Sequence, residues 1–207
     1  MTVGYDLVLD EIPEHAKVLD LGCGDGSLLT ILQEKKKVKG YGVEISEEGV
    51  SLCVEKGLYC YQADIDDGLS DYKDGSFDYV ILNQTIQNTK RPDYVINEVL
   101  RIGKKAIISF PNFAYISTRS YLMFRGTMPV NELLPYEWYE SPNIHLLTIS
   151  DMKKMAGAFS FRILSEKNFS SSGNGKSRLV RCFPNLLAQY GFFVIEKKQD
   201  AAVKIVH

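Results

Sequence analysis

Apolar runs of five or six residues alternate with segments of helical spacing along the first half of the chain. The runs cover residues 17–21, 40–44, 58–63, 77–82 and 105–110. The helical segments between them cover residues 27–33, 47–56 and about 92–101. Strands that are buried on both faces read as such continuous apolar runs, because helices cover a parallel sheet on both sides. The alternation therefore predicts a doubly wound α/β fold with a mostly parallel sheet.

The pattern changes after the fifth run. Residues 111–146 contain no strand-like run, and a helix is predicted from about 150 to 158. Two further strands are predicted over 161–167 and 191–197, with a serine- and glycine-rich loop at 170–175 between them. We expect an antiparallel strand to close the parallel sheet.

Length and charge narrow the classes of function. The chain has 207 residues and a net charge of −2, and its pI is about 6.0. One domain over residues 1–207 is expected at this length. A near-neutral chain lacks the basic patches that bind nucleic acid or an anionic membrane, so neither partner is expected. No apolar stretch approaches the ~20 residues of a membrane span and no signal peptide is visible, so a cytoplasmic protein is expected.

The four cysteines predict neither disulfides nor a metal site. Cys23, Cys53, Cys60 and Cys182 are scattered, and none forms a C-x-x-C pair. No group of cysteine, histidine and acidic residues has the sequence spacing of metal ligands. We therefore expect no bound metal and interpret the cysteines as small buried apolar residues.

A glycine-rich loop lies between the first run and the first helical segment. Asp20 is followed by Gly22, Gly24 and Gly26, a G-x-G-x-G pattern. Ser27 stands where a dinucleotide-binding G-x-G-x-x-G/A fingerprint has its third small residue, so that fingerprint is absent. Glycines here let the backbone turn sharply and approach a ligand. A carboxylate before the loop would repel a pyrophosphate but can bind an ammonium group.

Acidic residues also follow the next two runs. Glu44 is placed to accept hydrogen bonds from the two hydroxyls of a ribose, as acidic residues at this strand end do. Asp64 could accept from the amino group of adenine, with Ile65 against the ring. Together with the loop, these carboxylates favour a ligand that carries adenosine at one end and an amino acid at the other.

This arrangement resembles the class I S-adenosylmethionine-dependent methyltransferase family. The resemblance implies a Rossmann-like fold with a seven-stranded sheet that binds S-adenosylmethionine or S-adenosylhomocysteine. It implies that the methionine end of the cofactor lies beside the glycine loop and Asn83. It also implies that the ribose binds at Glu44 and that the adenine binds at Asp64 and Ile65. The cofactor residues so implied are Asp20, Gly22, Gly24, Gly26, Glu44, Ile45, Asp64, Ile65 and Asn83.

Several longer runs of the sequence cover residues 40–45 with 48–50, 76–87, 109–113, 128–130, 134–145 and 184–188. These runs resemble the MetW family of methionine-biosynthesis proteins. The resemblance implies a bacterial methionine-pathway protein that acts with the homoserine O-acyltransferase MetX and supports its acyl-transfer step. It implies no particular methylated substrate.

Few side chains could act as a base toward a methyl acceptor. His145 lies in the segment that can cover the ligand, and Asn112 ends the fifth run. These two are the candidate catalytic residues, and a structural role is the alternative for His145. No Pro-Cys nucleophile follows a strand, which argues against covalent chemistry on a nucleobase.

Aromatic residues concentrate between residues 110 and 140, inside the insert at about 111–146. They are Phe110, Phe113, Tyr115, Tyr121, Phe124, Tyr136, Trp138 and Tyr139. Such a segment suits a lid, a protein-contact surface or a satellite core. Two hypotheses follow. The favoured one is an S-adenosylmethionine-binding partner that activates the acyltransferase through this segment, and the alternative is a methyltransferase acting on a small metabolite.

Overall fold

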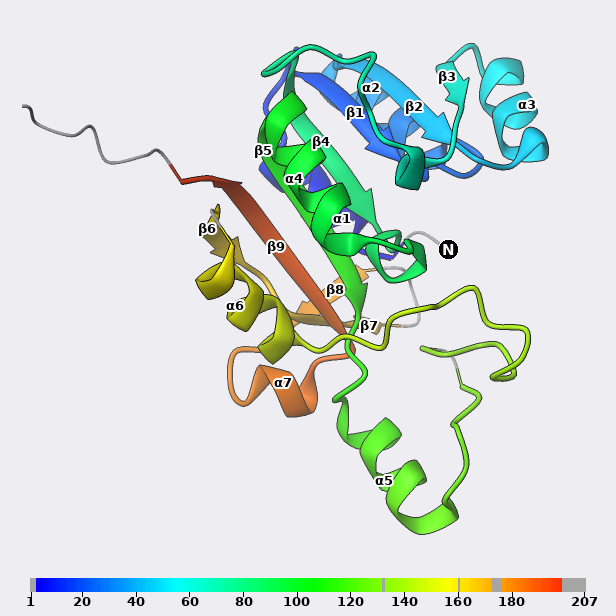
Figure 1. Ribbon diagram of the computed structural model, residues 1–207, viewed down its shortest axis with the longest axis vertical. Coiled ribbons are helices and arrows are strands. Elements are labelled where there is room, and N and C mark those ends of the chain that lie inside the picture. Colours follow the sequence, from blue (N-terminus) through cyan, green and yellow to red (C-terminus); the bar gives the residue numbers. More distant parts are fainter. Residues whose placement is uncertain (1–2, 132, 160, 173–175, 199–207) are drawn as a thin grey trace, which may run out of the picture.

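The computed structural model describes residues 3–131, 133–159, 161–172 and 176–198. Within these residues, nine strands form one sheet (Figure 1). They are β1 (Lys17–Leu21), β2 (Lys39–Glu44), β3 (Tyr59–Gln62), β4 (Phe77–Asn83), β5 (Gly103–Pro111), β6 (Phe161–Glu166), β7 (Phe169–Ser172), β8 (Lys176–Leu179) and β9 (Tyr190–Lys197). Their order is β3-β2-β1-β4-β5-β9-β7-β8, and β6 also pairs with β9.

Strands β1 to β5 are parallel, as predicted. Strand β9 runs antiparallel to both β5 and β6, so it is the predicted antiparallel closing strand. The carboxyl ends of β1, β2, β3 and β4 therefore lie at the same edge of the sheet, where ligands bind in open α/β folds.

Helices cover both faces of the sheet. The helices of the described residues are α1 (Tyr5–Glu11), α2 (Ser27–Lys36), α3 (Glu47–Glu55), α4 (Pro92–Ile102), α5 (Ile116–Arg125), α6 (Ile149–Ala158) and α7 (Pro184–Leu187), with short 3₁₀ helices η1 (Ile65–Asp67) and η2 (Ile86–Asn88). All of these except α5 lie near the sheet in Figure 1. Side chains of β4 alternate between the faces. Tyr79 and Ile81 pack with α1 and α2, whereas Val80 and Leu82 pack with α4 and α6.

The sheet has nine strands, whereas the family resemblance implies seven. The additional strands β7 and β8 form an antiparallel hairpin. The prediction of a loop at 170–175 is wrong for residues 170–172, which belong to β7, and residues 173–175 lie outside the described part. Phe169 in β7 stacks on Tyr190 with ring centroids 5.2 Å apart. This contact attaches the hairpin to β9. Without the hairpin, the remaining seven strands of the sheet have the order β3-β2-β1-β4-β5-β9-β6.

Three helices were not predicted. Helix α1 is short, and α7 has four residues. Helix α5 lies in the segment 111–146 and extends away from the sheet in Figure 1. The predicted absence of a strand there is confirmed for the described residues. Within the described part of the chain, every helix is too short or too polar to cross a membrane.

Candidate functional site

Three glycines with left-handed backbone conformations form the loop between β1 and α2. Gly22, Gly24 and Gly26 have φ angles of 73°, 56° and 74°, which residues with a Cβ rarely adopt. The Gly22 amide donates to the Val43 carbonyl at 2.8 Å and so fastens the loop to β2. Gly26 then precedes the first residue of α2.

The three glycines serve different purposes. A Cβ at Gly22 would lie 2.7 Å from Cγ2 of Thr85, and one at Gly26 would lie 2.3 Å from Cδ1 of Leu58. A Cβ at Gly24 would meet nothing within 4 Å. Gly24 therefore borders open space that a ligand can occupy. Gly26 lines neither cavity at this edge and packs the start of α2 against Leu58 and Cys53, whereas the resemblance implies that it contacts the ligand.

Two cavities adjoin at the carboxyl edge of the sheet. The first has a volume of about 380 Å³ and contains the glycine loop. The second has a volume of about 270 Å³ and contains the ends of β2 and β3. Gly22, Gln84 and Asn88 line both. A ligand longer than either cavity can thus extend across their shared wall.

The second cavity brings together Glu44, Ile45, Asp64 and Ile65. Glu44 is held in place by the backbone: its Oε2 accepts from the Gly24 amide at 2.8 Å, and its Oε1 accepts from the Ile45 and Ser46 amides at 3.0 Å each. Ile45 is 62% exposed, which leaves its side chain free to cover a flat ring.

Asp64 starts η1. One of its carboxylate oxygens accepts from the Asp66 amide at 2.9 Å, and the other forms an ion pair with Lys90 at 3.4 Å. Carboxylate oxygens have several acceptor positions, so Glu44 and Asp64 can each accept further hydrogen bonds from a ligand.

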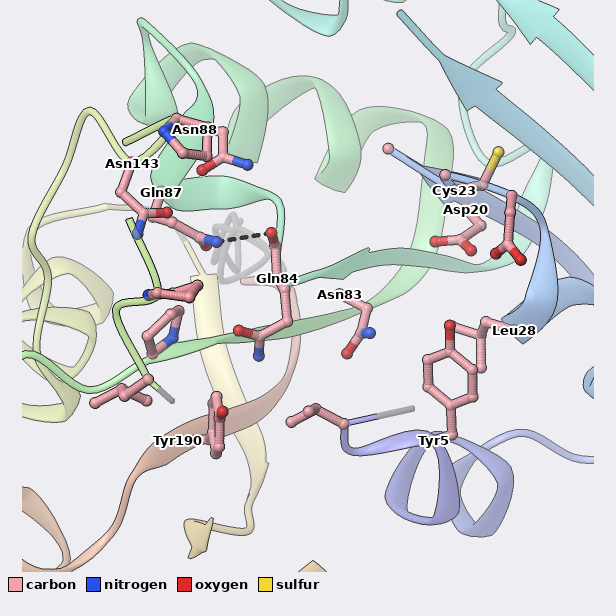
Figure 2. Close-up of a pocket in the computed structure, with 18 of the residues that line it drawn as sticks. Tyr5, Asp20, Cys23, Leu28, Asn83, Gln84, Gln87, Asn88, Asn143 and Tyr190 are labelled. Carbon is pink, nitrogen blue, oxygen red and sulfur yellow. Dashed lines mark hydrogen bonds between the residues drawn. The ribbon is translucent and has the colours of Figure 1, made fainter. Parts of the chain in front are cut away.

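Asp20 and Tyr5 lie on one side of the first cavity (Figure 2). Asp20 is only 2% exposed, and among the described residues none forms a hydrogen bond with its carboxyl group. Burial, followed by repulsion from Glu44, raises the pKa of Asp20 to about 7. Burial, followed by the nearby carboxylates of Asp20 and Asp25, raises the pKa of Tyr5 to about 12. An unpartnered buried carboxyl group is a strong site for an ammonium group.

Amide side chains line the other side of this cavity. Asn83 Oδ1 accepts from the Ser109 hydroxyl at 2.6 Å. Gln84 has a φ of 59°, an unusual backbone conformation for a residue with a side chain. Gln87 donates to the Gln84 carbonyl at 2.7 Å, drawn as the dashed line in Figure 2, but its buried Oε1 has no partner within the described residues. Sequence reasoning identified Asn83 here and missed Gln84 and Gln87.

Neither candidate base lies in these two cavities. His145 lines a third cavity of about 300 Å³, between α4 and α6. Asn112 is fully buried, and the prediction that it faces the ligand is wrong. Its amide donates to the Ala188 carbonyl at 2.8 Å and its Oδ1 accepts from the Ala114 amide at 3.2 Å. Asn112 thus joins chain segments and lines neither cavity.

The aromatic segment divides into a packed part and an exposed part. Phe110 is fully buried, and Phe113 and Tyr115 pack against the core. Beyond them, Phe124 is 78% exposed and Trp138 is 73% exposed. The satellite-core interpretation therefore fails for the outer part of the segment.

Three cysteines meet beside the site although they are scattered in the sequence. Cys23 lies in the glycine loop, and its sulfur is 3.8 Å from that of Cys53 and 3.6 Å from that of Cys60. Their three Sγ atoms lie within 4.8 Å of one another. Sequence spacing could not predict this cluster, because the residues come from a loop, α3 and β3.

Comparison with known proteins identifies relatives. A family model described as methionine biosynthesis protein MetW matches residues 3–195. The chain is 33% identical over 197 residues to the bifunctional methionine biosynthesis protein MetXA/MetW of Rhodopirellula baltica, a match that covers 91% of this chain. The chain spans only 32% of that relative's length. It is also 29% identical over 122 residues to the rRNA N(6)-adenosine-methyltransferase metl-5 of Caenorhabditis elegans, which covers 53% of this chain and 56% of that one.

Solved structures share the fold. A possible histamine N-methyltransferase from Thermotoga maritima superimposes with a TM-score of 0.68 at 17% identity, covering 94% of this chain and 87% of that one. An S-adenosylmethionine-dependent methyltransferase from Archaeoglobus fulgidus gives 0.65 at 16% identity, covering 94% of each chain. At such identities these structures establish the methyltransferase-like α/β fold alone. The family match and the relative at 33% identity go further: this chain belongs to the MetW family of methionine biosynthesis proteins.

Proposed function

We propose that this protein binds S-adenosylmethionine, or its demethylated product S-adenosylhomocysteine, and acts as an activating partner of a homoserine O-acyltransferase of the MetX type. We further propose that residues 1–207 form one cytoplasmic domain whose segment 111–146 carries the partner surface. The observation that carries the proposal is the exposed aromatic segment beside the two adjoining cavities.

The polar groups that line the two cavities suit such a ligand. The unpartnered carboxyl group of Asp20 is matched to the ammonium group of the methionine end. The open space beside Gly24 accommodates the chain of the amino acid. Glu44 can accept from the ribose hydroxyls, and Asp64 can accept from the amino group of adenine. When bound, the cofactor would supply an electrophilic methyl group on a sulfonium.

The proposed partner surface consists of large apolar side chains that are exposed in the segment 111–146. Met123, Phe124 and Trp138 are 80%, 78% and 73% exposed. Aromatic residues and methionine are enriched in protein-contact sites. The R. baltica relative carries MetXA and MetW parts in one polypeptide. That arrangement supports an acyltransferase of the MetX type as the protein that covers this surface.

One segment connects the ligand and the partner surface. Pro135, Tyr136 and Asn143 line the first cavity, and Trp138 and Tyr139 between them are exposed. A ligand that orders the inner residues also changes how the outer residues are presented. S-adenosylmethionine lies downstream of homoserine acylation, so occupancy of the cavity could report methionine status to the acyltransferase through linkage.

A methyltransferase acting on a small metabolite is the second candidate. The buried Oε1 of Gln87, which lacks a partner within the described residues, favours it because a bound polar metabolite could donate to that atom. The described part of the chain offers no histidine in the first cavity to remove a proton. This function therefore requires an acceptor that reacts without a strong base.

Co-purification tests the partner directly. The wild-type chain should retain the homoserine O-acyltransferase of its own organism, and the double variant Phe124→Ser/Trp138→Ser should bind it at least tenfold more weakly. Tyr61→Ser is the matched control, because Tyr61 is 72% exposed on β3 at the far end of the sheet. Failure of the wild-type chain to bind the acyltransferase would overturn the partner proposal.

A further inference from the structure

Three cysteine sulfurs lie close together beside the glycine loop. Cys23 comes from the loop, Cys53 from α3 and Cys60 from β3. The Cys23 sulfur lies 3.6 Å from that of Cys60 and 3.8 Å from that of Cys53. All three cysteines are free thiols.

The two separations that involve Cys23 match those of thiolates that share one metal ion, and the Cys53 and Cys60 sulfurs lie within 4.8 Å of each other. Two sulfurs at ~2.3 Å from a tetrahedral ion are ~3.8 Å apart, and a three-coordinate ion spreads them slightly further. A disulfide instead requires a sulfur–sulfur distance of ~2.05 Å. The sulfurs therefore need little movement to bind a metal, and more movement to form a disulfide.

The surrounding backbone leaves room for the sulfurs. A Cβ at Gly42 would lie 2.6 Å from Sγ of Cys23, and one at Gly26 would lie 2.8 Å from Sγ of Cys53. Leu29 and Leu58 complete the wall. Among the described residues, no histidine or carboxylate joins the three sulfurs as a further ligand. A pure sulfur donor set selects thiophilic ions over magnesium or calcium.

We propose that Cys23, Cys53 and Cys60 bind one thiophilic d¹⁰ metal ion, with monovalent copper fitting the three-sulfur set and zinc requiring a fourth ligand from solvent. For each sulfur that binds, one S–H bond breaks, its proton passes to solvent and one sulfur–metal bond forms. Because Cys23 lies between Gly22 and Gly24, a bound ion would tie the ligand-binding loop to α3 and β3. The site does not depend on the proposed function.

Burial affects the chemistry of two of the three thiols. Desolvation raises the pKa of Cys53 to about 11 and raises that of Cys23 well above its ordinary value. Both are therefore protonated thiols at neutral pH, and thiols react slowly with oxidants. Protons released on metal addition are then a direct measure of ligation.

The test is an anaerobic titration of the reduced full chain with monovalent copper, and separately with zinc, against a chelator of known affinity. The wild type and Cys182→Ser should each bind one ion, since Cys182 is exposed and outside the cluster. Cys60→Ser should bind at least 100-fold more weakly. Cys60 is only partly buried, so this substitution disturbs the core least.

X-ray absorption of the loaded wild type provides a measurement that needs no variant. Three sulfur neighbours per ion, with at least two protons released on loading, would support the proposal. Zinc bound at three sulfurs while copper is not retained would support the site and overturn the preference for copper. Equal affinity of the wild type and Cys60→Ser, or fewer than three sulfur neighbours, would overturn the site.

Discussion

The Gly24 amide donates a 2.8 Å hydrogen bond to Oε2 of Glu44 and joins the glycine loop after β1 to the end of β2. The other carboxylate oxygen of Glu44 is held by the amides of Ile45 and Ser46. Glu44 is therefore fixed before any ligand arrives. One carboxylate both shapes the loop and faces the second cavity, which leads to the first prediction.

Glu44→Gln should weaken the binding of S-adenosylmethionine at least tenfold. The substitution keeps the size of the side chain but replaces one acceptor oxygen with a donor, which conflicts with the backbone amides and with ribose hydroxyls. Isothermal titration calorimetry measures the effect. Glu48→Gln, on the exposed surface of α3, is the matched control and should bind as the wild type does. An unchanged Kd in Glu44→Gln would contradict the assignment of the second cavity.

Gly24→Ala should mainly weaken ligand binding, whereas Gly26→Ala should mainly lower stability. The Cβ of alanine at 24 enters open space, so the protein should fold with a loss of about 1 kcal/mol from the strained φ and should lose ligand affinity. Alanine at 26 overlaps Leu58 and Cys53, so it should lower the free energy of unfolding by about 2–4 kcal/mol. Thermal melts measure the stability of each variant, and calorimetry measures its ligand affinity. Similar melts for both variants would count against this division of roles.

Asp20→Asn should stabilise the protein at neutral and higher pH. The unfolded carboxyl group has a pKa of 3.8, whereas burial raises the folded value to about 7. Between these values the folded state holds a proton that the unfolded state has lost, so wild-type stability falls as pH rises from about 4 to about 7. Asparagine does not titrate. The variant should exceed the wild type by about 2–4 kcal/mol above pH 7, measured by urea denaturation.

The same carboxyl group should make ligand binding depend on pH. An ammonium group binds the ionised form of Asp20, so affinity for S-adenosylmethionine should increase as pH rises through about 7 and should be weak and flat in Asp20→Asn. A pH-independent affinity in the wild type would show that Asp20 does not meet the ligand's ammonium group.

Asn112→Ala should destabilise the fold and leave ligand affinity unchanged. The substitution removes the partner of the Ala188 carbonyl and of the Ala114 amide in a fully buried position. Buried groups left without partners cost about 2–4 kcal/mol together, which denaturant unfolding detects. If the variant were as stable as the wild type but lost ligand binding, Asn112 would belong to the site after all.

The buried strands were predictable because their environment leaves a simple pattern. Strands of a covered parallel sheet are largely apolar, and the central residues of β1, β4 and β5 are mostly buried and apolar. Helix α5 left no such pattern, because among its residues only Thr118 is buried. The β7–β8 hairpin was not predicted, because a run of serine and glycine residues is typical of a loop.

Residues of the cavities were predictable where they follow a strand or lie in the glycine loop. Asp20, Glu44 and Asp64 were found in this way. Tyr5 was missed because the short helix α1 has no side-chain cap. Gln87 was missed because η2, which carries it, is a single turn without periodicity. Contacts of this kind depend on tertiary packing.

The rate of homoserine acylation, measured with and without this protein, tests the central claim most directly. The purified acyltransferase should be at least tenfold faster with the wild-type chain than alone, and Phe124→Ser/Trp138→Ser should lose most of that gain. Added S-adenosylmethionine should change the rate only when the wild-type chain is present, and Glu44→Gln should abolish that response. An acyltransferase whose rate is the same with and without this chain would contradict the claim.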